Sequence, residues 1–328
     1  MIEASVFSKA AVVAPSRIAA QTGQAILAEG GNALEVSYVG NHQAHQLLQP
    51  DFNACPNSPL TVSCDSLRPY PNIGGVSGTG SNGFGNYAGM TAKLEKRFSA
   101  GWQYLFSYTY GHALANSGTT LSGSSGFGYL DNTNLSSSYS SAAWDIRHSA
   151  TASFLYELPF GKGKKYVNQA NRAVDAVIGG WQMNSIFTFR TGSPFTIRSN
   201  FCQGTFANCF ADILPGQSPN AAPSGGRNAN EWFNIAAFSK TVVPGTYGNN
   251  GLQTNNAPGQ RNVDVSLFKA ISFTERFKGQ FRAEAFNIGN TPQWGQPDNN
   301  VQDSAFGRIT STQTGSERRL QLALRVMF

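Results

Sequence analysis

Strict alternation of side-chain character along short segments is the feature that most limits how this chain can fold. The clearest case is GWQYLFSYTYG (residues 101–111), in which every second residue is aromatic. Successive side chains of a β-strand point to opposite faces, so these aromatics share one face of an extended segment. The five residues are Trp102, Tyr104, Phe106, Tyr108 and Tyr110. The pattern predicts a strand with one strongly aromatic face.

The same period recurs along the chain and predicts an all-β, antiparallel fold of about eight strands. The other seven segments are residues 33–40, 90–98, 148–160, 181–190, 262–271, 278–286 and 318–328. Two lysines, Lys96 and Lys269, fall on the apolar side of this pattern. Both stand near a strand end, where a long side chain can carry its charge to an interface.

The composition indicates where such strands fold. Charged residues make up 13% of the chain, against about 25% in typical soluble domains. No stretch approaches the roughly 20 apolar residues of a membrane-spanning helix, whereas about 9–11 tilted residues let a strand cross. The aromatic faces therefore predict a transmembrane β-barrel whose outer surface contacts lipid. The predicted lipid-facing aromatics are Trp102, Tyr104, Phe106, Tyr108, Tyr110, Phe154, Tyr156, Trp181, Phe187 and Phe189.

The connections between the strands alternate in length, as they do in outer-membrane barrels. Short or medium links follow the segments 90–98, 148–160 and 262–271. Long loops rich in Gly, Ser, Asn and Pro span residues 41–86, 112–146, 192–261 and 291–317. With the C-terminus on the periplasmic side, all long loops are expected outside and all short turns in the periplasm.

Four cysteines fall in two local pairs, each inside a predicted outside loop. They are Cys55 with Cys64 and Cys202 with Cys209. In an oxidising compartment, a disulfide within each pair would cross-link its loop. The alternative, a shared metal site, is weaker because neither pair has the two-residue spacing of a zinc knuckle.

Other chemistry has little support in the sequence. The net charge of +6 is scattered, so we expect no nucleic-acid partner. We expect no cofactor, metal or catalytic residue, and hence no enzyme. The one candidate acid–base pair is Asp145 with His148, in the segment WDIRH, which would suit a hydrolase at the barrel rim. Without a partner that positions a nucleophile, this is the weaker reading.

The first thirty residues fit none of these patterns. They are rich in alanine and suggest a short helix, or a segment that stands outside the fold. No signal peptide is visible. We therefore divide the chain into an unassigned segment, residues 1–30, and an outer-membrane barrel segment, residues 31–328.

Several longer stretches resemble the Oar-like branch of TonB-dependent outer-membrane receptors. Among them are LEVSYVGNHQAHQL (34–47), FGNYAGMTAKLEKRFSAGWQYLFSYTYGHAL (84–114), GGWQMNSIFTFRTGSPFTI (179–197) and FRAEAFNIGNTPQWGQP (281–297). The resemblance implies a 22-stranded barrel with an N-terminal plug, of which this chain is the C-terminal portion. It further implies ligand uptake across a Gram-negative outer membrane, driven through a TonB contact that would need the missing plug.

The resemblance also implies partners. These are outer-membrane lipid, an unknown ligand and the barrel-assembly machinery. The signal that this machinery reads would lie at Leu322, Leu324, Val326 and Phe328, where the family ends on alternating apolar residues and a phenylalanine. Two alternatives stay open beside the hydrolase: a self-contained eight-stranded structural or adhesive barrel, and, more distantly, a soluble β-sandwich.

Overall fold

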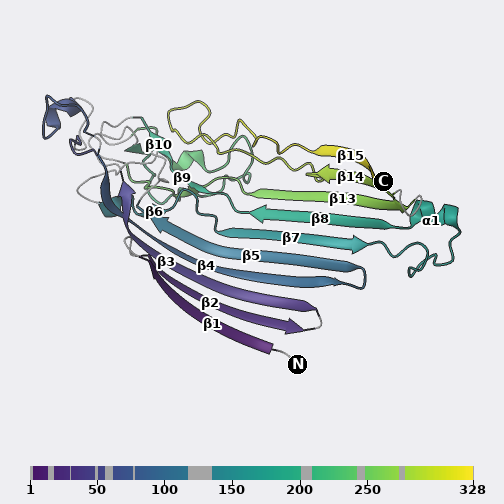
Figure 1. Cartoon of the computed structure of the whole chain (residues 1–328). Coiled ribbons are helices and arrows are strands. Elements are labelled where there is room, and N and C mark those ends of the chain that lie inside the picture. The colour runs from purple at the N-terminus through teal and green to yellow at the C-terminus, as the bar shows by residue number, and fades with distance from the viewer. Residues whose placement is uncertain are drawn as a thin grey trace.

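A single large antiparallel sheet dominates the computed structural model of this chain (Figure 1). The strands follow one another across the sheet in the order β1-β2-β3-β4-β5-β7-β8-β13-β14-β15, and the short β6 pairs with β5. The structure describes residues 3–13, 18–29, 31–48, 51–55, 62–76, 78–116, 135–200, 209–241, 248–272 and 278–327.

The strands of the sheet differ considerably in length. They are β1 (Glu3–Val13), β2 (Ile18–Glu29), β3 (Asn32–Leu48), β4 (Gly80–Ser99), β5 (Trp102–Ala115), β6 (Ser140–Ser141), β7 (His148–Glu157), β8 (Trp181–Arg190), β13 (Gln260–Ser272), β14 (Lys278–Phe286) and β15 (Arg319–Met327). Two small two-stranded sheets pair β9 (Pro194–Phe195) with β12 (Asn255–Asn256) and β10 (Arg198–Ser199) with β11 (Cys209–Phe210). The helices are α1 (Arg172–Ile178) and the 3-10 turns η1 (Cys64–Leu67), η2 (Leu135–Ser138) and η3 (Ile235–Ala237).

All eight predicted strands form, and the all-β antiparallel fold class is confirmed. The prediction for the first thirty residues is wrong. Instead of a helix or a segment outside the fold, they supply β1 and β2, and β2 pairs with β3 from Glu29↔Asn32 to Ala19↔His42. The paired backbone groups of β3 hold this segment in the sheet, although its own side-chain pattern is irregular.

The register places the predicted apolar sides of neighbouring strands in common rows. Phe106 of β5 lies opposite Leu94 of β4 and Ala152 of β7. Ala152 in turn lies opposite Phe187 of β8, which lies opposite Val263 of β13. Directly opposed residues share a face of the sheet, so the aromatic and aliphatic positions merge into one continuous surface.

Short connections gather at one end of the sheet. Ala100 and Gly101 form the β4–β5 turn and both have positive φ, 53° and 85°. Positive φ at both central residues is the geometry of a two-residue hairpin turn whose twist matches that of the strands. The link from β7 to β8 folds into α1, where the side chain of Asn171 accepts a hydrogen bond from the Val174 amide (2.9 Å) and caps the helix.

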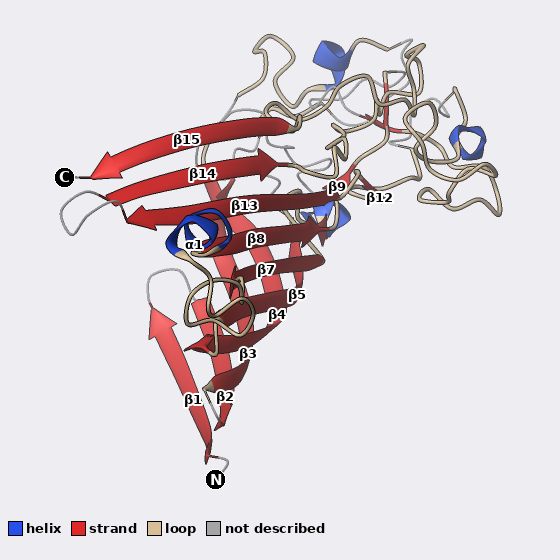
Figure 2. Ribbon diagram, turned by 90° about the vertical axis from the view of Figure 1, so that its right-hand side faces the viewer, coloured by secondary structure: helices blue, strands red, loops and turns tan. Residues whose placement is uncertain are grey.

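The long loops gather at the opposite end (Figure 2). Among the described residues, the loops after β8 and β14 share a small hydrophobic core. This core consists of Phe195, Ile197, Ala211, Phe233, Ala237, Phe238 and Val301. Phe233 is fully buried and makes an edge-to-face contact with Phe306 at a centroid distance of 5.3 Å. The main concentration of buried apolar side chains therefore lies in the loops, and the sheet itself is a single layer.

The loop between β3 and β4 forms a separate ordered unit. Asn53 is 1% exposed, and its amide group donates to the carbonyl oxygens of Tyr70 (3.0 Å) and Ile73 (2.6 Å). Arg68 forms an ion pair with Asp51 at 3.3 Å. Burial of a satisfied amide and a paired carboxylate fixes this loop without a large apolar core.

The sheet does not close on itself in the part of the chain that is described, and β1 and β15 form its two edges. β3 and β4 have 17 and 20 residues, more than the 9–11 that a tilted strand needs to cross a bilayer, so this hairpin projects beyond the others (Figure 1). Within the described residues, no helix is long and apolar enough to span a membrane.

Candidate functional site

An aromatic row lies on the sheet beside the short turns. Trp102 packs against Tyr104 and Phe154 at centroid distances of 5.5 and 6.2 Å, and Phe154 stacks on Tyr156 at 6.3 Å. Trp181 makes an edge contact with Phe281 at 6.3 Å. Side chains with an apolar body and a polar tip are typical of the membrane interface.

Two lysines, Lys96 and Lys269, lie over aromatic rings of this row. The Nζ atom of Lys96 lies 4.5 Å from the ring centroid of Trp102 and donates to the carbonyl oxygen of Ser99 (3.0 Å). The Nζ atom of Lys269 lies 5.1 Å from the ring of Trp181 and donates to the carbonyl oxygen of Gly179. Both charges therefore sit at the turns that end the strands, over aromatic faces that attract cations.

A second row lies on the same face, beside the long loops. The hydroxyl of Tyr108 lies 2.7 Å from Nδ1 of His148, and the ring of Tyr110 lies 5.1 Å from the His148 ring. Tyr108 shares its row with Ala150, which lies opposite Phe189. Phe106 and Phe187, which carry no polar tip, lie between the two rows.

The separation of the two rows suits a bilayer. Trp102 and Tyr110 are eight residues apart on β5, which corresponds to about 27 Å along the strand. With a tilt of about 35–45° the distance across the membrane falls to roughly 20 Å, close to the apolar band of about 25 Å in outer-membrane barrels.

The side chains between the rows are not covered by protein. Phe106 is 40% exposed and Phe187 is 48% exposed, and Leu322 on the edge strand is 73% exposed. They therefore do not pack inside a closed globule, as a soluble sandwich requires. Exposure alone does not distinguish the two faces, because Ile186 on the other face is 48% exposed. Contact with lipid stays a prediction that rests on the chemistry of the faces.

The opposite face of the sheet carries polar groups that pair with one another. Lys93 and Glu95 form an ion pair at 2.7 Å, and the hydroxyls of Thr91 and Thr109 lie 2.9 Å apart. This is the arrangement expected of a surface that lines a hydrated interior.

Asp145 anchors the junction between β5 and the start of β7. Its carboxylate is 6% exposed and accepts hydrogen bonds from Nδ1 of His112 and from the Ala113 amide, both at 2.9 Å. A guanidinium nitrogen of Arg147 lies 3.4 Å from the same carboxylate. His148 binds Tyr108 instead, so the acid–base pair Asp145–His148 that a rim hydrolase would use is not formed. The role of Asp145 here is to hold two segments together.

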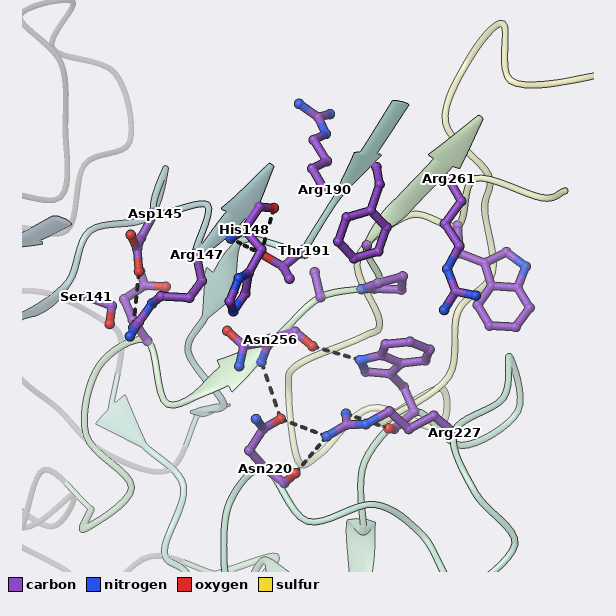
Figure 3. A pocket seen from close by; sticks show the side chains of 18 of the residues that line it. Ser141, Asp145, Arg147, His148, Arg190, Thr191, Asn220, Arg227, Asn256 and Arg261 are labelled. Atoms are coloured by element: carbon purple, nitrogen blue, oxygen red, sulfur yellow. Dashed lines mark hydrogen bonds and ion pairs between the residues drawn. The ribbon is translucent and has the colours of Figure 1, made fainter. Parts of the chain in front are cut away.

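A pocket of about 850 Å³ opens beside this junction (Figure 3), a volume typical of small-molecule sites. Strand ends, the segment before β7 and both loops of the hydrophobic core contribute to its wall. Its charged lining comprises Asp145, Arg147, Arg190, Arg227 and Arg261. Arginines outnumber carboxylates in this lining even without Arg190, whose side chain points to the other face of the sheet, so the lining is positive.

Neutral groups hold one of these arginines in place. The guanidinium of Arg227 donates to the backbone oxygen of Asn220 (2.7 Å), to its side-chain oxygen (3.1 Å) and to the carbonyl of Trp232 (3.0 Å). It also lies 5.3 Å from the ring centroid of Trp232. Burial lowers the pKa of Arg227, because the charged guanidinium loses part of its hydration there. The guanidinium still stays protonated at physiological pH.

Two tryptophans form the apolar part of the wall. The Trp232 ring donates from Nε1 to the carbonyl of Asn256 (2.7 Å), which fixes its orientation, and it meets Trp294 edge-on at 5.9 Å. The pocket therefore combines fixed aromatic surfaces with guanidinium groups. Sequence reasoning missed it, because these residues stand alone in separate loops and form no motif.

The cysteine and C-terminal predictions fall largely outside the described residues. Cys55 is 3% exposed and disulfide-bonded. Cys202, the side chains of Cys64 and Cys209, and Phe328 lie outside the described part, so both pairings stay predictions. The remaining residues of the predicted assembly signal, Leu322, Leu324 and Val326, lie along β15. No group of three or more His, Cys, Asp or Glu side chains among the described residues is placed to hold a metal.

Comparison with known proteins identifies the family of the chain. No curated protein matches the chain. A family model described as "Outer membrane beta barrel domain" matches residues 27–321, which include β3 to β14 and the start of β15, and it points to an outer-membrane location. The chain therefore belongs to the outer membrane beta barrel domain family.

Proposed function

We propose that this chain forms part of the wall of a TonB-dependent outer-membrane receptor that binds a ligand outside the cell and takes it up. The observation that carries the proposal is the division of the molecule into a bilayer-sized band and a folded cap of loops at one end. Ordered loops above a barrel are suited to ligand capture, since binding residues commonly stand on loops fixed by a rigid scaffold. The Oar-like sequence resemblance supplies the link to TonB.

The open edges of the sheet support a barrel larger than the ten consecutive strands. An unpaired backbone group in the hydrocarbon of a membrane costs several kcal/mol, so spanning strands need partners on both sides. Both β1 and β15 have one partner each in the described chain. Pairing with additional strands, as in a 22-stranded receptor, would satisfy both edges. A closed eight-stranded barrel, in contrast, does not match the ten strands of the sheet.

We include in the proposal the partners that such a receptor needs: outer-membrane lipid around the barrel, the assembly machinery acting on the end of β15, and TonB acting through a plug. We propose no catalytic role, because Asp145 is engaged with His112, Ala113 and Arg147 at a structural junction.

The proposal is tested by comparing strains of the source organism that lack this reading frame, lack TonB, or lack both. Growth is measured on limiting supplies of iron, carbon and phosphate. If the chain serves TonB-dependent uptake, loss of the frame causes a defect on at least one supply, and loss of TonB causes the same defect. The double mutant is then no worse than the strain without TonB. An additive defect in the double mutant contradicts the proposal.

A second candidate is an adhesive barrel, and the loop between β3 and β4 favours it. This ordered loop exposes large apolar side chains, with Phe52 61% and Tyr70 64% exposed. Such groups at the end of a projecting hairpin are placed to contact another surface. Attachment of the same strains to surfaces and to one another separates the two candidates. Adhesion lost without any uptake defect favours the adhesive barrel.

A further inference from the structure

The arginine-rich pocket stands on the aromatic face of the sheet. Its lining includes His148, Phe189 and Arg261, from β7, β8 and β13. His148 lies opposite Tyr110, and Phe189 lies opposite both Ala150 and Arg261. All three are therefore on the face that carries Tyr108 and Tyr110. The pocket continues that face just beyond the row of aromatics beside the long loops.

The side chain of Arg190 points in a different direction from those of the other three arginines. It lies opposite Ser149 and Gln260, so alternation sends its side chain to the other face. Figure 3 shows it extending away from the other labelled residues. The cations that matter for a ligand are thus Arg147, Arg227 and Arg261.

These three arginines have little compensating charge. Arg147 shares Asp145 with His112, and Arg227 is held by neutral oxygens. Arg261 has no carboxylate partner among the residues that the structure describes; it is exposed and extends toward the pocket (Figure 3). Guanidinium groups bind phosphate and carboxylate through paired, charge-assisted hydrogen bonds. An anion is the ligand that this charge distribution favours.

The remaining residues of the pocket wall are suited to a sugar ring attached to the anionic group. Trp232 and Trp294 present aromatic surfaces, and Asn220, Asn256 and Thr254 supply neutral hydrogen-bonding groups. A sugar ring has apolar faces that pack on an aromatic side chain, and hydroxyls around its edge that bond to amides. A cation or a purely apolar molecule would leave these groups unmatched.

We propose that this pocket binds an anionic sugar, a ring that carries a phosphate or carboxylate held by Arg147, Arg227 and Arg261. Its place beside the outer aromatic row favours a source in the surrounding leaflet, a phosphorylated glycolipid headgroup. The inference goes beyond the proposed uptake and does not depend on it; it depends on which face of the sheet meets lipid.

The test uses the full chain folded in a neutral detergent, with binding followed by calorimetry and tryptophan fluorescence. Three probes separate the contributions of the anionic group, the sugar ring and the lipid. They are glucuronate, glucose as the same ring without the carboxylate, and lipid A as a phosphorylated glycolipid. Glucuronate and lipid A are expected to bind, and added salt is expected to weaken both. Glucose is expected not to bind. Tighter binding of lipid A than of glucuronate assigns the leaflet as the source, and binding of glucuronate alone assigns a soluble ligand.

The matched variants are Arg227→Gln with Arg261→Gln, and Arg172→Gln on α1 at the opposite end of the molecule. Loss of two charge-assisted contacts is expected to weaken binding about tenfold or more, whereas the control is expected to bind as the parent does. If the double variant does not fold, the parent protein alone tests the proposal. The salt dependence of its binding and its affinity for glucuronate relative to glucose are then the deciding measurements. The proposal is overturned if glucose binds as well as glucuronate, if neither anion binds, or if the folded double variant binds as the parent does. None of these results bears on the strain comparison that tests uptake.

Discussion

An arginine placed at the middle of the aromatic face should destabilise the protein far more than one placed on the other face. Phe106 lies midway between Trp102 and Tyr110, and thus near the centre of the band between the two aromatic rows. The adjacent residue Ser107 points to the opposite side of the sheet. The substitutions Phe106→Arg and Ser107→Arg therefore put the same charge at one depth on opposite faces.

The expected magnitude follows from this position. An arginine at the bilayer midplane of a barrel costs about 2–4 kcal/mol, falling to about 0–1 kcal/mol near the interface. Loss of the Phe106 ring adds up to roughly 1.5–3 kcal/mol, so Phe106→Ala is needed to isolate the charge. We expect Phe106→Arg to be about 2–4 kcal/mol less stable than Phe106→Ala, which is roughly a 30- to 700-fold change in the folding equilibrium.

Equilibrium unfolding in phospholipid vesicles, followed by fluorescence of the five tryptophans, measures these differences. Ser107→Arg should differ little from Ser107→Ala, and Tyr110→Arg should differ from Tyr110→Ala by no more than about 1 kcal/mol. An equal cost at Phe106 and Ser107, or a greater cost at Ser107, would refute the assignment of the aromatic face to lipid.

Three further predictions concern the loops and the end of the chain. Asn53→Ala removes the amide that contacts the carbonyl oxygens of Tyr70, Ile73 and Gly74 in the β3–β4 loop. A cost of about 1–3 kcal/mol should appear as faster proteolysis of that loop, and Asn72→Ala is the exposed control. Cys55 should resist alkylation until the chain is reduced, and mass spectrometry of the peptides should pair it with Cys64. A disulfide between Cys55 and Cys202 or Cys209 contradicts the prediction of a disulfide within each loop. Phe328→Ala should lower the yield of heat-modifiable protein in the outer membrane, whereas Met327→Ala, one residue away on the other face, should leave the yield unchanged.

The strands could be predicted because their signal is local. A period of two is visible within ten residues, so residues 101–111 and 181–190 predict both a strand and its faces. The extension of β3 to Leu48 and of β4 back to Gly80 was not predictable in this way. These ends contain polar residues and glycine, and their strand conformation comes from pairing between them, such as His42 with Asn86.

The first two strands, β1 and β2, could not be predicted for the same reason. β2 reads IAAQTGQAILAE, without clean alternation, and becomes a strand because β1 and β3 pair with its backbone. Its membership of the sheet depends on partners that composition does not identify. The preference of a residue for a strand depends on its neighbours in the sheet, so local composition alone does not decide it.

The pocket was beyond sequence reasoning for a different reason. Arg147, Arg227 and Arg261 are separated by 80 and 34 residues, and each is unremarkable in its own segment. Arg147 and Arg261 stand at the ends of β7 and β13, which both pair with β8. Arg227 reaches them because the loop after β8 folds around a core that contains Phe195, Phe233 and Val301. The buried aromatics of this core are dispersed along segments rich in Gly, Ser, Asn and Pro, so no local pattern reveals them.

Site-directed spin labelling along β5 tests the central claim most directly. Single cysteines are placed in turn at positions 104 to 109, in a chain whose four native cysteines are replaced by serine, and the protein is folded into phospholipid vesicles. Labels at 104, 106 and 108 should be accessible to oxygen dissolved in lipid and protected from a water-soluble nickel chelate, and labels at 105, 107 and 109 should show the reverse. Uniform access to the nickel chelate at all six positions, or the opposite alternation, would contradict an aromatic face in contact with lipid.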